Sequence, residues 1–174
     1  MATRGIDYAN LSLKDALDLA ILIEDEAQER YEEFAVQMDQ HRTPEAAKFF
    51  RYMVENEAKH GRELSARRVA RFGDAPSAVS RTMIYDIEAP DYDAARAFMS
   101  ARKAMEAALA SEVKAHAFFV SALPTLQDAE VRALFEELRD EELEHQQLVQ
   151  AELYKLGPES GLSDDDFVDE PAAQ

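Results

Sequence analysis

The chain has 174 residues, of which 47% are apolar and 32% charged, and its formal net charge is −17. This length suits one domain with a sizeable core, and the acidic balance argues against a nucleic-acid or anionic-membrane partner, because such partners are bound through Lys and Arg. The sequence contains no cysteine, which excludes disulfides, iron–sulfur clusters and cysteine-ligated zinc or iron sites.

The first half of the chain predicts two long helices joined by a tight break. One helix covers about 12–40 and opens with Ser12 and Asp15 in the spacing of a capping box. The sequence "HRTP" then interrupts the chain, and its last two residues supply an N-cap and a first-turn proline for a second helix over about 44–71. Gly73 ends this second helix.

The second half of the chain repeats this arrangement after a long connector. The connector covers 73–92 and has room for a short helix around 77–84. A third helix is predicted over about 93–122 and, after a break at a proline, a fourth over 126–156. Two short links and one long link between four helices indicate an all-α four-helix bundle with one long crossover between the second and third helices.

We expect a single bundle domain over residues 1–157, followed by a tail over 158–174. The tail is acidic and poor in apolar residues, so it buries too little apolar surface to fold, and we interpret it as disordered. No stretch of the sequence approaches a membrane span in length, and the N-terminus has no apolar signal segment. We therefore expect a cytoplasmic protein without a membrane partner.

Each predicted helix carries apolar residues at spacings of three and four, which is typical of a face packed into a bundle. Near the middle of each helix a glutamate interrupts this apolar series. In the second and fourth helices a histidine follows that glutamate three residues later, and residues three apart share one helical face. The interrupting residues are Glu24, Glu57 with His60, Glu112, and Glu142 with His145.

The two halves of the sequence align with each other as an internal repeat. Residues 20–31, "AILIEDEAQERY", match 108–119, "ALASEVKAHAFF", and residues 50–60, "FRYMVENEAKH", match 135–145, "FEELRDEELEH". The interrupting glutamates and histidines coincide in this alignment. A repeated helix pair would place four carboxylates and two imidazoles about a pseudo-two-fold axis at one level of the core.

Four carboxylates inside a helical bundle require compensation, because a buried ionised carboxylate is costly. Two divalent cations would neutralise them, and one glutamate from each of two helices with Glu-x-x-His from each of the other two is the ligand set of ferritin-like di-iron proteins. Carboxylate and imidazole ligands suit iron or manganese. The sequence therefore predicts a site for two iron ions, with manganese or a mixed pair as alternatives.

Taken singly, each of these residues also has a simpler interpretation. Glu24 or Glu112 could face solvent, and either Glu-x-x-His histidine could be a core residue bonded to its own glutamate, to a water or to a backbone carbonyl. His116, one turn beyond Glu112, is either a further ligand or donor, or a histidine on an outer helix face. Tyr31 is either a core residue or a hydrogen-bond donor to a ligand carboxylate. The order of the four glutamates along the chain favours the metal site.

These motifs resemble those of the ferritin-like superfamily, and above all its rubrerythrin branch, over about residues 12–156. The resemblance rests on "AxxxExxAxxxY" at 20–31, "AxxxExxAxxxF" at 108–119 and the two Glu-x-x-His pairs. It implies a ferritin-like fold, a di-iron site that reacts with hydrogen peroxide or O2, and a homodimer. The resemblance also implies a role for each predicted ligand. Glu57 and Glu142 would bridge the two irons, Glu24 and Glu112 would be terminal carboxylates, and His60 and His145 would each bind one iron.

Three features depart from these families. Rubrerythrins add a rubredoxin domain, for which this sequence has no cysteines, so the resemblance implies an external electron donor. They carry a further ligand glutamate where this chain has Ala115, which predicts a more symmetric site, like a bacterioferritin ferroxidase centre. Cage-forming ferritins continue into a fifth helix where this chain has Gly157 and Pro158, so a storage shell is not expected. The long connector would also allow helix pairs to be swapped between protomers.

Three functions are consistent with this pattern. The one that we favour is a di-iron oxidoreductase that oxidises Fe(II) pairs with hydrogen peroxide or O2, either in peroxide detoxification under oxidative stress or as a ferroxidase. The second is a non-catalytic iron-binding protein that handles iron as a cargo or partner protein. The third is a structural bundle whose buried carboxylates are protonated or paired.

Overall fold

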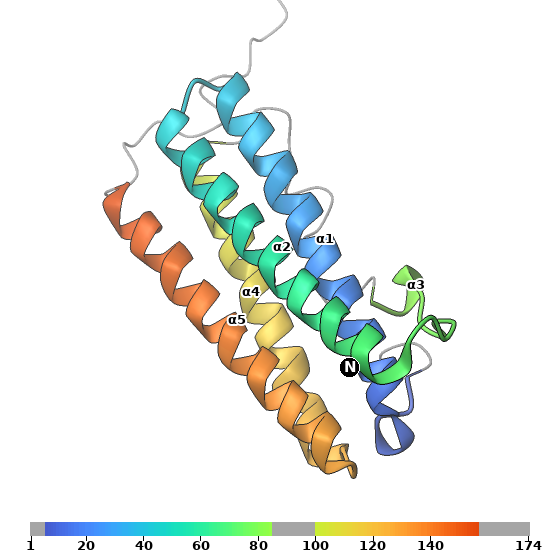
Figure 1. Cartoon of the computed structure of the whole chain (residues 1–174). Helices are drawn as coiled ribbons and strands as arrows, with labels where there is room; N and C mark the ends of the chain where they lie inside the picture. Colours follow the sequence, from blue (N-terminus) through green and yellow to red (C-terminus); the bar gives the residue numbers. More distant parts are fainter. Residues whose placement is uncertain (1–5, 85–99, 157–174) are drawn as a thin grey trace, which may run out of the picture.

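The computed structural model describes residues 6–84 and 100–156 as a bundle of helices. Within these residues there are no strands, and four long helices lie side by side, with a short helix beside them (Figure 1). The long helices are α1 (Leu13–Gln40), α2 (Pro44–Phe72), α4 (Ala101–Ala122) and α5 (Ala129–Lys155), and the short helix is α3 (Arg81–Ile84). The prediction of an all-α four-helix bundle is confirmed.

The long helices form two antiparallel hairpins, α1 with α2 and α4 with α5, and most of the close approaches between helices lie within these pairs. α2 ends at the opposite end of the bundle from the point where α4 begins (Figure 1). The chain between them therefore crosses the length of the bundle, as the predicted long crossover requires. Among the described residues, no helix combines the length and the apolar character that spanning a membrane would need.

The first two helices begin and end close to where the sequence predicted. The Ser12 side chain accepts a hydrogen bond from the Asp15 backbone N–H, as in a capping box. Pro44 occupies the first position of α2, where its missing N–H costs nothing. Gly73 ends α2 with a φ of 56°, a left-handed conformation that favours glycine.

The third and fourth helices begin later than predicted. An uninterrupted helix from residue 93 is wrong at Ser100, whose side chain caps α4 by accepting a hydrogen bond from the Lys103 backbone N–H. Residues 93–99 of that prediction lie outside the described residues. α5 begins at Ala129 rather than 126, because the Asp128 side chain accepts hydrogen bonds from two N–H groups of the first turn.

The apolar interior of the described residues forms two clusters, one toward each end of the bundle, and all four long helices contribute to both. In the first cluster the rings of Phe119 and Phe135 meet edge to face, 5.4 Å apart. In the second, the rings of Phe34 and Phe50 lie 5.2 Å apart. Full burial of each such ring contributes about 1.5–3 kcal/mol. Between the clusters lies a polar layer at the middle of the long helices.

A buried ion pair holds the start of the crossover against the bundle. Arg68 of α2 donates from Nε to Asp18 Oδ1 of α1 at 2.7 Å, and both side chains are buried. The Arg68 guanidinium also donates to the Gly73 carbonyl at 2.5 Å, and Lys14 donates to the Pro76 carbonyl at 3.0 Å. Burial alone would raise the pKa of the Asp18 carboxyl, but Arg68 and Lys14 outweigh burial and lower this pKa below 3.8.

α3 lies beside α1, outside the four-helix core. Arg81 donates to both carboxylate oxygens of Glu29 in α1, at 2.7 and 2.5 Å, and Ile84 is buried. The short helix predicted over 77–84 is thus present in its last four residues. The rest of the connector, on which helix swapping would depend, and the predicted tail both fall outside the described residues.

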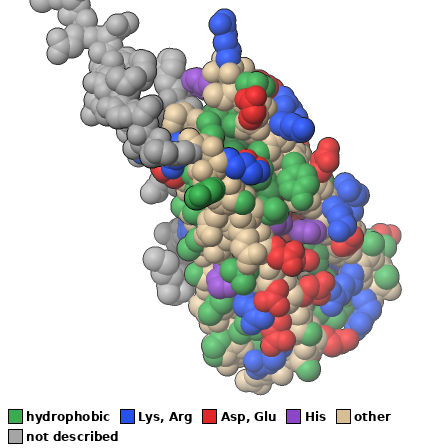
Figure 2. Space-filling model, turned by 90° about the vertical axis from the view of Figure 1, so that its left-hand side faces the viewer, with side chains coloured by type: hydrophobic (Ala, Val, Ile, Leu, Met, Phe, Trp, Pro, Cys, Tyr) green, Lys and Arg blue, Asp and Glu red, His purple; other side chains and the backbone are tan. Residues whose placement is uncertain are grey.

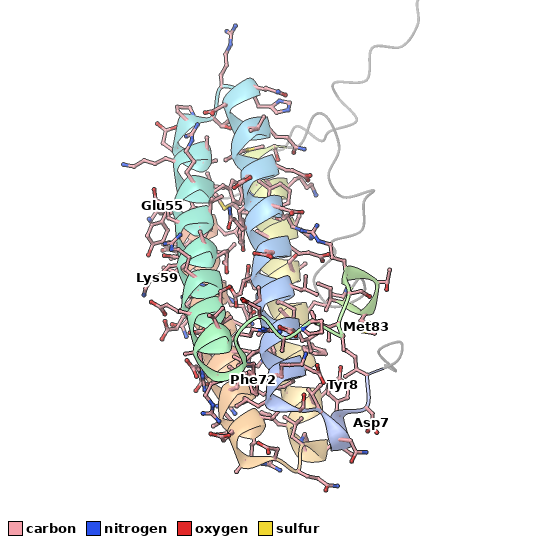
Figure 3. The ribbon with its side chains drawn as sticks, turned by 45° about the vertical axis from the view of Figure 1, so that its right-hand side comes forward. Asp7, Tyr8, Glu55, Lys59, Phe72 and Met83 are labelled. Carbon is pink, nitrogen blue, oxygen red and sulfur yellow. The ribbon has the colours of Figure 1, made fainter. Side chains whose placement is uncertain are left out.

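The outer faces of the helices are charged. Glu55 and Lys59 of α2 are exposed and project away from the bundle (Figure 3). Across the boundary between α2 and α5, Arg67 donates to Glu137 at 3.0 Å. Such exposed pairs contribute little stability, so the two hairpins are held together mainly by the apolar clusters.

Candidate metal centre

The polar layer between the apolar clusters contains all six residues that the sequence predicted as metal ligands. Five of them are buried, and the sixth, His60 of α2, keeps 16% of its side chain exposed. The buried five are Glu24 of α1, Glu57 of α2, Glu112 of α4, and Glu142 and His145 of α5. The alternative in which Glu24 or Glu112 faces solvent is therefore wrong.

Glu112 is contacted by side chains of α1 and α5. His145 Nδ1 lies 3.4 Å from Glu112 Oε2 and 3.3 Å from Glu57 Oε1. The Tyr31 hydroxyl donates a hydrogen bond to Glu112 Oε1, and Gln146 Nε2 donates to the Glu112 backbone carbonyl at 3.2 Å. Tyr31 is thus both a core residue and a donor to a buried carboxylate, which combines the two interpretations that the sequence left open.

Electrostatic interactions around Glu112 favour its ionised form. Burial alone would raise the pKa of its carboxyl, but His145, Glu142 and Tyr31 outweigh burial and lower that pKa below 4.5. Burial and the Glu112 charge raise the pKa of the Tyr31 hydroxyl well above 10, so Tyr31 remains the hydrogen-bond donor.

The His60 imidazole lies where the polar layer is closest to the surface. Its Nδ1 lies 3.7 Å from Glu24 Oε2, and no described residue offers this buried nitrogen a hydrogen bond. The interaction with Glu24 raises the pKa of His60 above 6.5. The His60 ring stacks on the His145 ring, with centroids 5.4 Å apart and planes 11° from parallel. The Glu-x-x-His motifs of α2 and α5 therefore face each other, and each imidazole contacts a glutamate of another helix.

The donor atoms fit a pair of metal ions. Among the described residues they form three groups, and within each group the ligand atoms lie within 4.8 Å of one another. The groups are Glu57, His60 and His145; Glu24, His60 and Glu141; and Glu112, Glu142 and His145. The groups adjoin because His60 and His145 each belong to two of them. Carboxylate oxygens and imidazole nitrogens are the donors of iron and manganese sites, and a metal ion would satisfy the buried Nδ1 of His60.

The sequence did not predict one residue of these groups, Glu141 of α5. It is half-buried and lies with Glu24 and His60. Burial raises the pKa of its carboxyl above 4.5. Its position four residues before His145 could have pointed to it, because this spacing places both residues on one helical face. Acidic residues at such positions are, however, common on solvated faces.

The two remaining histidines lie away from the cluster. His116 on α4 is half-buried and belongs to none of the three groups found among the described residues. This supports the interpretation of His116 as a helix-face histidine rather than a further ligand. His41 follows the last turn of α1, and its backbone N–H donates to the Gln37 carbonyl at 3.0 Å.

A four-helix bundle with one long crossover, and with glutamates and Glu-x-x-His pairs at one level of its core, is the architecture of the ferritin-like superfamily. Within it, the chain belongs to the rubrerythrin family, whose model matches residues 15–153. The chain is also similar to the crystal structure of an uncharacterised conserved protein from Magnetospirillum magnetotacticum MS-1, with 27% sequence identity and a TM-score of 0.71. That match covers 88% of this chain and 100% of the other. A comparison with curated proteins gave no match.

Proposed function

We propose that this protein is a di-iron oxidoreductase in which a pair of Fe(II) ions is oxidised by hydrogen peroxide or O2. The observation that carries this proposal is the convergence of four buried carboxylates and two imidazoles, contributed by both hairpins, between the two apolar clusters. Membership of the rubrerythrin family supports it, because the family implies a metal site of this kind.

The proposed ligands are the six predicted residues: Glu24, Glu57, His60, Glu112, Glu142 and His145. By similarity to the family, Glu57 and Glu142 would bridge the ions, and the other four would each bind one. The four carboxylates balance the charge of two divalent ions, and the apolar clusters on either side limit the access of water. The Tyr31 hydrogen bond orients Glu112. A manganese or mixed pair would use the same donors.

When bound, the two Fe(II) ions supply one electron each, and with two protons these electrons convert one hydrogen peroxide molecule into two waters, or one O2 into hydrogen peroxide. Repeated turnover requires an external electron donor, because this sequence has no cysteine to hold a rubredoxin-type iron. We include in the proposal a cytoplasmic homodimer, with the bundle over 1–157 as the active unit.

A second function, iron handling without catalysis, is favoured by the net charge of −17. A strongly acidic surface raises the local concentration of cations such as Fe(II). In that case the acidic tail over 158–174 would dock the protein on a partner, and the iron would be delivered rather than cycled between oxidation states.

Anaerobic titration of the metal-stripped protein with Fe(II) tests the metal site. We expect two ions per chain, and loss of both in the Glu57→Leu/Glu142→Leu double variant. The matched control is Glu55→Leu/Glu144→Leu, which changes exposed glutamates of the same two helices and should bind iron like the wild type. A wild type that binds no iron, or a double variant that binds as the wild type does, would show that the proposal is wrong.

Steady-state consumption of hydrogen peroxide separates the two functions. With a chemical reductant as electron donor, the oxidoreductase consumes peroxide over many turnovers. An iron-handling protein stops after the bound Fe(II) has been oxidised once.

A further inference from the structure

The candidate metal centre has an enclosed side and an open side. We define the enclosed group as Glu112, Glu142 and His145, and the open group as Glu24, His60 and Glu141. Every member of the enclosed group is buried, whereas in the open group only Glu24 is. Figure 2 looks onto the side of the bundle where α5 lies and shows a histidine surface bordered by acidic side chains near the middle of this face.

Glu141 is placed to act on the open side. It shares a face of α5 with His145, one turn further along the helix. A carboxylate oxygen of Glu141 lies within 4.8 Å of ligand atoms of both Glu24 and His60, which belong to the other hairpin. Among the described residues, no hydrogen bond or ion pair restrains the Glu141 carboxylate, so a cation can recruit it without breaking an existing contact.

We propose that Glu141 is a seventh protein ligand of the metal centre and binds the ion held by Glu24 and His60. This inference rests on the proposed function, because it requires that the six predicted ligands bind a metal pair. It also follows from the local chemistry. The half-buried Glu141 carboxylate repels the buried Glu24 carboxylate beside it, and a cation bound by both removes this repulsion.

This assignment changes the expected symmetry of the site. The sequence predicted a symmetric centre because Ala115 stands where rubrerythrins carry a further glutamate, and Ala115 is fully buried with no donor to offer. A carboxylate from α5 instead gives the open ion one more protein ligand than the enclosed ion. The two ions should therefore differ in affinity and in ease of exchange.

Titration calorimetry of the metal-stripped full chain with Co(II), a divalent probe that is stable in air, tests the assignment. We expect two binding events in the wild type. Glu141→Gln should weaken one event by about 10–100-fold, the range typical for loss of a group that supports a metal site, and leave the other within about twofold. Glu144→Gln, an exposed glutamate three residues further along α5, should behave as the wild type does.

A crystal structure of the Co(II)-loaded wild type provides a second measurement that does not depend on the variant. We expect a Glu141 oxygen in the coordination sphere of the ion bound by Glu24 and His60. Two unchanged binding events in Glu141→Gln, equal weakening by Glu141→Gln and Glu144→Gln, or a Glu141 side chain away from the ion would each overturn the assignment and leave the proposed function intact. A wild type that binds no Co(II) would overturn both.

Discussion

Replacing Glu57 and Glu142 together by leucine should stabilise the metal-free protein and abolish its stabilisation by metal. The two residues are only 2% and 5% exposed. In the absence of metal, four carboxylates share two imidazoles in the polar layer. The double replacement removes half of the carboxylates and none of the imidazoles, and leucine fills a similar volume.

The structure shows how the remaining charges would be paired after this replacement. Glu24 Oε2 lies 3.7 Å from His60 Nδ1, and Glu112 Oε2 lies 3.4 Å from His145 Nδ1. Each remaining carboxylate therefore keeps one imidazole. Replacing buried charged groups by apolar ones of similar volume is often neutral, or stabilising by about 1–4 kcal/mol. At about 2–4 °C per kcal/mol for a chain of this size, the midpoint of thermal unfolding should rise by about 2–16 °C.

Metal should stabilise the wild type alone. A ligand at one hundred times its dissociation constant stabilises the folded state by about 2.7 kcal/mol, which corresponds to about 5–11 °C in the wild type. The double variant should not respond to metal.

Thermal unfolding followed by circular dichroism, with and without Fe(II) under anaerobic conditions, measures both effects. The control Glu55→Leu/Glu144→Leu changes exposed side chains, each of which should alter stability by no more than about 0.5 kcal/mol. If the metal-free double variant unfolds at a lower temperature than the wild type, the reasoning is refuted, because the buried carboxylates then stabilise the bundle through their own hydrogen bonds.

Tyr31→Phe removes the hydroxyl that donates to Glu112 and should weaken Co(II) binding by about 10–100-fold in titration calorimetry. Tyr52→Phe, at an exposed tyrosine of α2, should not, and equal effects would contradict the role of Tyr31. Asp18→Asn removes a carboxylate whose pKa is lowered in the folded protein, so its contribution to stability is present above pH 3.8 and is lost as the pH falls through the folded pKa. In urea denaturation the variant should be less stable than the wild type near neutral pH, with a difference that shrinks in acid; a difference independent of pH would argue against the pair. Gly61→Ala places a methyl group 3.7 Å from the Glu24 Cβ, an ordinary contact, and should stabilise α2 by about 0.5–1 kcal/mol. A lower denaturation midpoint for this variant would show that the neighbouring side chains cannot accommodate the methyl group.

The six residues of the polar layer could be predicted from the sequence because two independent patterns conflict at their positions. The helical period assigns Glu57 and Glu142 to the inner faces of their helices, whereas their charge requires water or a partner. Periodicity determines which residues share a face, and the internal repeat determines which levels of the two hairpins correspond. Together these patterns specify the contents of the polar layer without any knowledge of side-chain conformation.

The contacts that the sequence did not predict depend on how the helices are rotated against one another. Glu141 lies four residues before His145, but acidic residues are common at such positions on solvated faces, so the local pattern does not show that α5 places Glu141 beside Glu24 of α1 and His60 of α2. Asp18 and Arg68 are 50 residues apart, and acidic and basic residues are so frequent on these helices that no single pair could be selected. The late start of α4 has a local cause, since a serine caps a helix only where its own backbone is extended, as it is at Ser100.

The division of the apolar interior into two clusters affects how cooperatively the protein unfolds. Without metal, the two ends of the bundle are coupled through the helix backbones and through a polar layer in which four carboxylates share two imidazoles. Each end can then open by itself, so amide hydrogen exchange of the metal-free protein should give two distinct opening free energies, one for each cluster. A bound metal pair would join residues of all four helices between the clusters, and both ends should then open together, at the free energy of global unfolding.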